Sequence, residues 1–208
     1  MKHIAESTVR RLSLYLRFLE DFEAQGHGTI SSGELASQGG TTSAQVRKDL
    51  SLFGSFGKRG LGYSVGDLSR SLREILGLGR PWRVFIVGAG KIGAALAQYR
   101  GFRERGFNVI AVYDVDPARV GRSFGHITVR DQRDMEADIA RLQPDIALLA
   151  VPPEAAQPLV DRVVKAGLRA ILNFAPAPIH VPAHVTLRSV NMAFELEILS
   201  YALVHQDE

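Results

Sequence analysis

The chain of 208 residues is long enough for one large domain or two modest ones, and its 46% hydrophobic and 23% charged residues are typical of a globular protein. No apolar run approaches the ~20 residues of a membrane span, and no signal-peptide core precedes the first helical pattern, so we expect a cytoplasmic protein without a membrane partner. The absence of cysteine excludes disulfides, thiolate-zinc sites and thiol-based redox sensing. A redox response would therefore need a bound cofactor, and no metal is expected.

The formal net charge of +3 belongs entirely to the N-terminal part of the chain. Residues 1–80 contain 11 of the 25 Lys and Arg residues and eight of the 22 Asp and Glu residues, whereas the two kinds balance over 81–208. So small an excess is compatible with binding to nucleic acid, but it also occurs in proteins with other functions. The motifs must therefore decide.

The first 80 residues are predicted to form a winged-helix DNA-binding domain. In chain order the expected elements are helices over 7–23, from Ser31 to Gly39 and from Thr42 to about Phe53, a hairpin over 54–63 and a helix over 67–76. Helical spacing of apolar residues indicates the first helix, and capping boxes open the second and third. Alternating aromatic and glycine residues indicate the hairpin. Three helices followed by a small hairpin are the winged variant of the helix-turn-helix.

The third of these helices has the residues that suit contact with DNA. At about 100° per residue, Val46 and Leu50 point to one side, toward a core. The other side presents small, cationic and hydroxyl residues, which fit the major groove because Arg can bind guanine through two hydrogen bonds and Lys or Ser can bind phosphates. The predicted contacts are Ser43, Ala44, Arg47, Lys48 and Ser51. The alternative is a solvated helix face.

The hairpin turn, Lys58-Arg59-Gly60, is a second candidate DNA contact. An Arg on a thin projection can enter a narrow, A·T-rich minor groove, where the negative potential is strongest. An ordinary charged turn is the alternative, but the position directly after the third helix favours contact with DNA.

From Trp82 onward strands and helices alternate, which predicts a parallel sheet covered on both faces. The expected strands span 83–87, 107–113, 126–129, 145–151, 169–173 and 184–190, and the expected helices span 91–99, 131–142, 154–166 and 191–205. The predicted fold class is α/β, with a winged-helix domain over 1–80, a Rossmann-type domain over 81–190 and a C-terminal helix over 191–208. A glycine-rich hinge lies near 77–81.

Residues 84–93 join an apolar strand to a Gly-x-Gly-x-x-Gly turn and a helix. Such glycines allow a tight turn and close approach of a pyrophosphate, unless they only turn the chain. A second strand ends in Asp114, 26 positions after Gly88, where a carboxylate would accept both ribose hydroxyls and repel a 2′-phosphate. NAD(H) is therefore favoured over NADP(H). The predicted binding residues are Gly88, Ala89, Gly90, Lys91, Ile92, Gly93 and Asp114.

Two apolar segments are expected to complete the cofactor site at the carboxyl ends of later strands. They contain Val151-Pro152 and Asn173-Phe174, and open α/β sheets bind ligands at this edge. If they line the nicotinamide pocket, the cationic NAD⁺ ring suffers more from desolvation than the neutral NADH ring. The composition thus favours NADH over NAD⁺.

The last helix is apolar over most of its circumference. One stripe contains Met192, Leu196, Leu199 and Leu203, and a second, nearly opposite, contains Phe194, Ile198 and Tyr201. Such a helix must be buried by more than one surface, either in its own domain or, as we favour, in a symmetric homodimer formed by exchange between subunits. A dimer would place two reading helices on palindromic DNA.

Across nearly the whole chain, five motifs in this order resemble the Rex family of bacterial redox-sensing transcriptional repressors: 45–51, 60–63, 87–93, 113–117 and 173–176. The resemblance implies a homodimer with a winged-helix domain, a Rossmann domain and a domain-swapped C-terminal helix. It also implies that NADH closes the dimer and moves the DNA-binding heads off the operator, whereas NAD⁺ competes weakly.

The same resemblance assigns three residues to a network that couples cofactor to DNA. These are Arg17, Tyr99 and Asn191, the last at a position where we expect the family to have Asp. An amide can accept a hydrogen bond from Arg17 but forms no ion pair with it.

Two other classes of protein remain as alternatives. An NAD-dependent dehydrogenase would need a substrate domain and a general acid-base, yet 82–208 suffice only for a nucleotide fold, and His126, His180 and His184 form no arrangement with a recognisable function. We therefore expect no enzymatic activity. A coenzyme-A-binding domain could use the same glycines but has no DNA-binding head.

Overall fold

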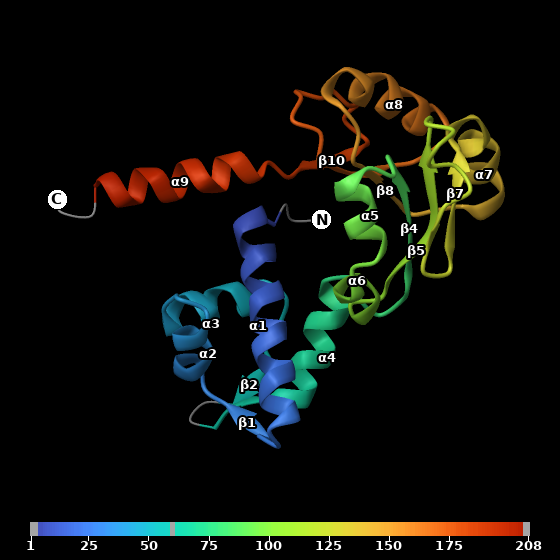
Figure 1. The fold of residues 1–208 in the computed structure, drawn as a ribbon. Coiled ribbons are helices and arrows are strands. Elements are labelled where there is room, and N and C mark those ends of the chain that lie inside the picture. The colour runs from blue at the N-terminus through green and yellow to red at the C-terminus, as the bar shows by residue number, and fades with distance from the viewer. Residues whose placement is uncertain (1–3, 59–60, 206–208) are drawn as a thin grey trace. The chain divides into compact units, whose positions relative to one another are not determined.

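The computed structural model describes residues 4–58 and 61–205, and the chain divides into two compact units, Met1–Arg80 and Pro81–Glu208. The helices of the first unit are α1 (Glu6–Ala24), α2 (Ser32–Gln38), α3 (Ser43–Ser51) and α4 (Val65–Ile75), and its strands are β1 (Thr29–Ile30), β2 (Gly57–Lys58) and β3 (Gly62–Ser64). The three strands form an antiparallel sheet in the order β1-β3-β2. This unit is the winged helix-turn-helix that the sequence predicts (Figure 1).

One apolar cluster holds the first unit together. It joins Leu12, Leu16 and Leu19 of α1 to Val46 of α3 and Leu72 of α4, all at most 1% exposed. Each helix therefore contributes one apolar face to the core, and its opposite face is left to solvent.

The second unit is a doubly wound sheet. Its strands are β4 (Trp82–Val87), β5 (Phe107–Asp114), β6 (Ser123–Phe124), β7 (Ile127–Asp131), β8 (Ile146–Leu149), β9 (Ala170–Asn173) and β10 (Thr186–Ser189). Its helices are α5 (Lys91–Ala97), α6 (Arg100–Glu104), the 3₁₀ turn η1 (Gln132–Asp134), α7 (Met135–Leu142), α8 (Pro153–Lys165) and α9 (Met192–Val204). The strand order is β10-β9-β8-β4-β5-β7-β6, and every pair is parallel except β6–β7. The order reverses between β4 and β8, and open α/β sheets bind ligands at the carboxyl ends of such neighbours.

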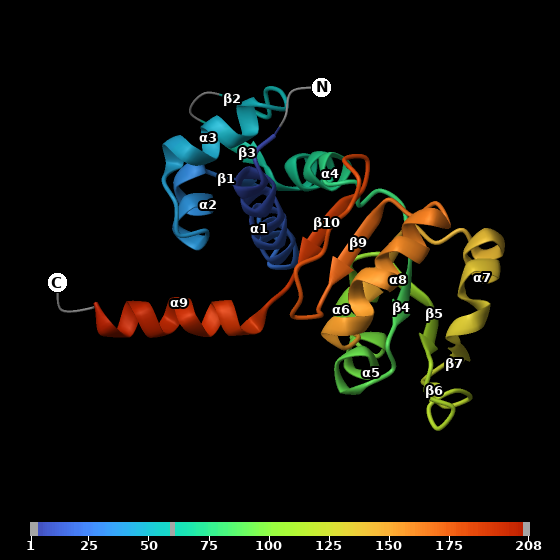
Figure 2. The same cartoon turned by 90° about the horizontal axis from the view of Figure 1, so that it is seen from above.

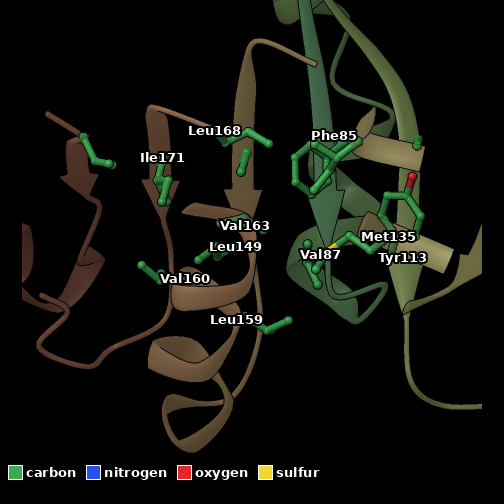
Figure 3. Packing of buried hydrophobic residues seen from close by; sticks show 14 residues of the cluster. Phe85, Val87, Tyr113, Met135, Leu149, Leu159, Val160, Val163, Leu168 and Ile171 are labelled. Carbon is green, nitrogen blue, oxygen red and sulfur yellow. The ribbon is translucent and has the colours of Figure 1, made fainter. Parts of the chain in front are cut away.

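The two faces of this sheet bury separate clusters. On one face, Phe85 and Val87 of β4 pack with Tyr113 of β5, Met135 of α7 and Leu159 of α8 (Figure 3). On the other face, Val84, Ile86 and Val112 pack against α5 and α6. Helices therefore cover both faces, as the alternating pattern predicts (Figures 1 and 2).

The structure departs from the predicted elements in short segments. The helix expected over 91–99 ends at Ala97, and Tyr99, in extended conformation, separates it from the unpredicted α6. A Cβ on Gly101 would lie only 2.7 Å from the Tyr99 ring. The absence of a side chain at Gly101 therefore permits the interruption between the two helices. The two-residue strands β1 and β6 are too short for any periodicity to reveal. Within the described part of the chain, no helix combines the length and apolar character of a bilayer span.

Candidate DNA-reading face and dinucleotide site

Helix α3 presents a solvent-facing side of the predicted composition. The Thr42 hydroxyl caps the helix by accepting a hydrogen bond of 3.1 Å from the Gln45 amide. Val46 and Leu50 are buried, whereas the opposite side exposes Ala44, Arg47, Lys48 and Ser51, with Ser43 half-buried at the first turn. This side is open to a large ligand.

The side chains on this face differ in how freely they can reach a ligand. Arg47 Nη1 donates a hydrogen bond of 2.9 Å to Ser32 Oγ, so its guanidinium lies against the start of α2. Ser51 Oγ donates to the Lys48 carbonyl oxygen at 2.8 Å. A contact from Arg47 to a base would therefore replace its hydrogen bond to Ser32. A bidentate contact favours this exchange because it is stronger than the bond that is lost.

A buried polar cluster that sequence reasoning missed fixes α3 on α1. Asp49 is 1% exposed, and its two carboxylate oxygens accept hydrogen bonds from Arg11 Nε at 2.6 Å and Arg11 Nη2 at 2.8 Å. Tyr15 Oη at 3.0 Å and Gln45 Nε2 at 2.8 Å also donate to this carboxylate. An acid on the inward side of an amphipathic helix is the signal that would have indicated a buried partner.

The partners of Asp49 keep it charged. Burial raises the pKa of its carboxyl, but hydrogen bonds from Arg11, Gln45 and Tyr15 outweigh that effect and leave the pKa below its usual value. Burial and the bond to Asp49 also raise the pKa of Tyr15 to about 12. The cluster therefore holds a carboxylate and a neutral phenol, and the side chain of Gln45 is engaged by Asp49 within the winged-helix unit.

We expect Asp49→Asn to destabilise the winged-helix unit by ~2 kcal/mol at neutral pH. Breaking a buried ion pair costs about 3–5 kcal/mol, and the 25% exposure of the Arg11 side chain reduces that loss by solvent screening. Because the folded pKa of Asp49 is depressed, the stabilisation is complete above the unfolded value of about 4 and is lost as pH falls through the folded pKa. Urea unfolding at several pH values should show the parent losing this part of its stability in acid.

Asp67→Asn is the matched control for that measurement, since both side chains of the Asp67–Arg70 ion pair are exposed. It should change stability by less than about 1 kcal/mol. Equal stability of Asp49→Asn and the parent would contradict the structural importance of the cluster.

The hairpin contributes β2 and β3 to the winged-helix unit. Lys58 pairs with Gly62, which has φ +78°, and a Cβ added to Gly62 would lie 2.5 Å from the Ile30 carbonyl oxygen, too close to be accommodated. The predicted contacts Arg59 and Gly60 lie outside the described residues. The DNA contact of this turn stays a prediction.

In the second unit, the three glycines of the turn after β4 meet different surroundings. Gly88 has φ +99°, and its Cβ would lie 2.2 Å from the Ala150 carbonyl oxygen. A Cβ on Gly93 would lie 1.7 Å from the Gly88 carbonyl oxygen. At Gly90 the nearest atom is Arg119 Nη1 at 3.9 Å, so two glycines are required by the fold and the third borders open space.

Asp114 ends β5 beside this turn. Its side chain is nearly buried, and Oδ2 accepts hydrogen bonds from the Ala89 amide at 2.6 Å and from Arg119 Nη1 at 3.2 Å, while Oδ1 accepts from the Asp116 amide at 2.9 Å. Burial raises the pKa of this carboxyl, but these hydrogen bonds have the larger, opposite effect and leave the pKa below its usual value. A charged acceptor is thus held next to the glycine turn. Lys91 and Ile92, the first residues of α5, are exposed there.

The two apolar segments lie at the carboxyl ends of neighbouring strands. Val151 Cγ1 approaches the Cβ position of Gly88 to 3.0 Å, and the exposed Pro152 follows it. Asn173 is fully buried, and its amide bonds to the backbone of Ala175 and to the Ser189 hydroxyl. The Asn173 side chain therefore holds its own turn. Phe174 of the same segment is half-buried, and ligand binding by Asn173 and Phe174 stays a prediction.

The residues assigned to coupling lie in both units. Arg17 is exposed on α1 in the first unit. In the second, Tyr99 is 60% exposed with its ring edge-on to Phe102, and Asn191 Oδ1 caps α9 by accepting from the Ala193 amide at 3.0 Å. No group of His, Asp or Glu able to hold a metal occurs among the described residues.

None of the residues of α9 is buried in the described part of the chain. Its large apolar residues are between 59% and 75% exposed: Met192, Phe194, Leu196, Ile198, Leu199, Tyr201, Leu203 and Val204. An apolar surface this continuous is typical of an interface.

Comparison with known proteins finds one family model over part of each unit. Residues 3–51 match the family described as "Putative DNA-binding protein N-terminus", and residues 79–177 match the "CoA binding domain" family. A redox-sensing transcriptional repressor Rex of Pelotomaculum thermopropionicum is 46% identical over 204 residues, which are 98% of this chain and 96% of that protein.

Three solved structures of RSP, a Rex-family repressor, match the whole chain, and two of them contain a cofactor. The complex with β-NAD⁺ and operator DNA has a TM-score of 0.94 at 38% identity, covering 100% of this chain and 95% of that chain. The complex with β-NADH has a TM-score of 0.90 at 36% identity, covering 100% and 97%.

Fold and site together define a DNA-binding regulator of the winged-helix class that contains its own nucleotide domain. The chain belongs to the Rex family of redox-sensing transcriptional repressors. The family resemblance and the fold class predicted from the sequence are thereby confirmed, while exchange of α9 between subunits stays a prediction.

Proposed function

We propose that this chain represses transcription by binding palindromic operator DNA as a homodimer, and that NADH bound in the second unit releases it. The observation that supports this most directly is the open space at Gly90 beside the buried, charged Asp114. The same chain exposes Arg47 and Lys48 on its reading helix. Because the operator is DNA, we place the protein in the cytoplasm.

The residues around the site favour a particular cofactor. The charge of Asp114 suits two ribose hydroxyls and opposes a 2′-phosphate, so NAD(H) is the preferred class. Val151, Pro152 and Phe174 offer an apolar surface at the carboxyl edge of the sheet, which disfavours the cationic ring of NAD⁺ relative to NADH. NADH is thus the tighter effector and NAD⁺ the weaker competitor. A solved relative is seen in complex with β-NAD⁺ and with β-NADH, which supports NAD(H) as the cofactor class.

An operator titration tests the proposal. Fluorescence anisotropy of a labelled palindromic operator should fall as NADH is added, whereas NAD⁺ should raise the NADH concentration needed for release. Operator binding that ignores NADH at saturating concentration would contradict the proposed function.

A second candidate function is coenzyme A binding, which the family match over 79–177 favours. Titration with each ligand separates the two, since NADH has a near-ultraviolet absorption band and fluorescence that coenzyme A lacks. Release of operator by coenzyme A but not by NADH would establish the second candidate. In either case the ligand acts as an effector, and we propose no catalysed reaction.

The homodimer is proposed from α9. Its thirteen residues are marginal as an isolated helix, so the exposed apolar surface needs a cover. A second copy of the chain supplies one by symmetric exchange of α9, and it also brings two copies of α3 to the two halves of a palindrome.

We expect Leu199→Glu to convert the dimer into a monomer. A charge on the apolar surface of α9 is costly to bury, and in the monomer this position is already 59% exposed and tolerates it. Light scattering after gel filtration measures the mass directly. Glu197→Gln, on the polar strip of the same helix, is the control and should stay dimeric. A monomeric parent would contradict the proposal, as would a Leu199→Glu variant that remains dimeric.

We further propose that Arg17, Tyr99 and Asn191 make the contacts that differ between the DNA-bound and released dimers. Asn191 already caps α9 through its oxygen, and a carboxylate caps equally well. Asn191→Asp therefore retains the helix start while adding a charge that can pair with Arg17.

A further inference from the structure

We propose that Arg119 is an affinity- and specificity-determining residue for the adenosine half of the dinucleotide, because its guanidinium lies between the ribose-binding acid and the pyrophosphate space. This inference rests on the proposed function. One nitrogen, Arg119 Nη1, is 3.2 Å from Asp114 Oδ2 and 3.9 Å from the position of a Cβ on Gly90. A second, Arg119 Nε, is 3.4 Å from Asp116 Oδ2.

The backbone around Arg119 is fixed by its own hydrogen bonds. The Arg119 amide donates to the Asp116 carbonyl oxygen at 2.9 Å, and the Ala118 amide donates to Asp116 Oδ1 at 2.9 Å. The Gly121 amide donates to the Val129 carbonyl oxygen at 2.9 Å, which ties the end of the turn to β7. The side chain itself is 43% exposed, so the guanidinium can rotate while its base stays in place.

The charges around this side chain define what it does for a ligand. Two carboxylates, Asp114 and Asp116, contact the Arg119 guanidinium that borders the space next to Gly90, and a dinucleotide adds two negatively charged phosphates. Arg119 is the cation that the structure places against both acids, so it lowers the repulsion that a phosphate would otherwise meet. The planar guanidinium of Arg119 can exchange its hydrogen bond to Asp114 for hydrogen bonds to the pyrophosphate when ribose hydroxyls bind that carboxylate.

This placement has two consequences that separate Arg119 from the rest of the site. NADH, NAD⁺ and ADP share the adenosine half, so all three should depend on Arg119 to the same degree. A 2′-phosphate adds charge next to Asp114, so NADPH should depend on Arg119 more strongly than NADH does. The distinction between oxidised and reduced nicotinamide lies elsewhere and should not change.

Calorimetric titration of the full chain with ADP, NADH, NAD⁺ and NADPH tests the inference. We expect Arg119→Ala to weaken ADP, NADH and NAD⁺ about tenfold each and NADPH about a further tenfold. Arg119→Lys should recover part of the loss, because it restores the charge but not the two-pronged geometry. Asp114 keeps its hydrogen bonds from the Ala89 and Asp116 amides, so Arg119→Ala should lower thermal stability only slightly, which is measured alongside.

Arg122→Ala is the matched control, since it removes the same charge from an exposed position three residues along the same segment. It should leave all four affinities within about twofold of the parent. Equal or tighter ADP binding by Arg119→Ala would overturn the inference, and so would an unchanged ratio of NADPH to NADH affinity. A parent that binds none of the four ligands would instead overturn the proposed function.

Discussion

Gly90→Val should yield a repressor that stays on its operator at any NADH concentration. The valine side chain occupies the open space next to Asp114 and Arg119 that a pyrophosphate needs, so NADH affinity should fall by about 100-fold or more, a loss of ~2.7 kcal/mol. The fold should survive, because Gly90 has φ −68°, which any residue adopts, and the nearest atom is the far end of a flexible side chain. Operator anisotropy with and without NADH measures the result.

The neighbouring glycines provide the contrast that makes this variant informative. A side chain at Gly88 or Gly93 would collide with a backbone carbonyl oxygen at 2.2 Å or 1.7 Å, so those variants should lose thermal stability as well as NADH binding. Only Gly90→Val is expected to lose the cofactor with the fold intact. Release of that variant by NADH at the parent's concentration would place the effector site elsewhere.

Arg47→Ala should abolish discrimination between operator and random DNA. A bidentate contact to guanine contributes ~1–3 kcal/mol per half-site, and the proposed dimer uses two half-sites. Competition binding against random DNA measures the change. NADH binding and dimer mass should match the parent, since Arg47 is exposed and its hydrogen bond to Ser32 lies at the surface.

Arg10→Ala is the matched control for that variant. Arg10 is an exposed arginine of the same unit that pairs with Glu6 on α1 and not on the reading face. It should retain operator selectivity. An Arg47→Ala variant that still selects the operator would remove Arg47 from base recognition.

Much of the fold follows from local patterns. The amphipathic spacing that buries Val46 and Leu50 of α3 also identifies its exposed side, and an apolar strand, a glycine turn and a distant acid identify β4 and Asp114. Such signals are readable because each depends on neighbours within one element. The same holds for the alternation of strands and helices that defines the second unit.

Other features depend on contacts between distant segments and leave little trace in the sequence. Asp49 is paired by Arg11, 38 positions away, and Asn173 donates a hydrogen bond to Ser189, 16 positions away. The relation of Arg119 to Gly90 arises only when β5 lies beside β4. The spacing of apolar residues in α9 likewise shows that this helix needs a partner surface, but it does not identify that surface.

The central claim is that NADH and operator DNA bind the same dimer antagonistically, and reciprocal binding measures this directly. The dissociation constant of NADH is determined by calorimetry for the protein alone and for the protein saturated with operator. Thermodynamic linkage requires operator to weaken NADH by the same factor by which NADH weakens operator, typically about 5–150-fold. Equal factors well above one are the predicted result, and an NADH affinity that operator leaves unchanged would contradict the account.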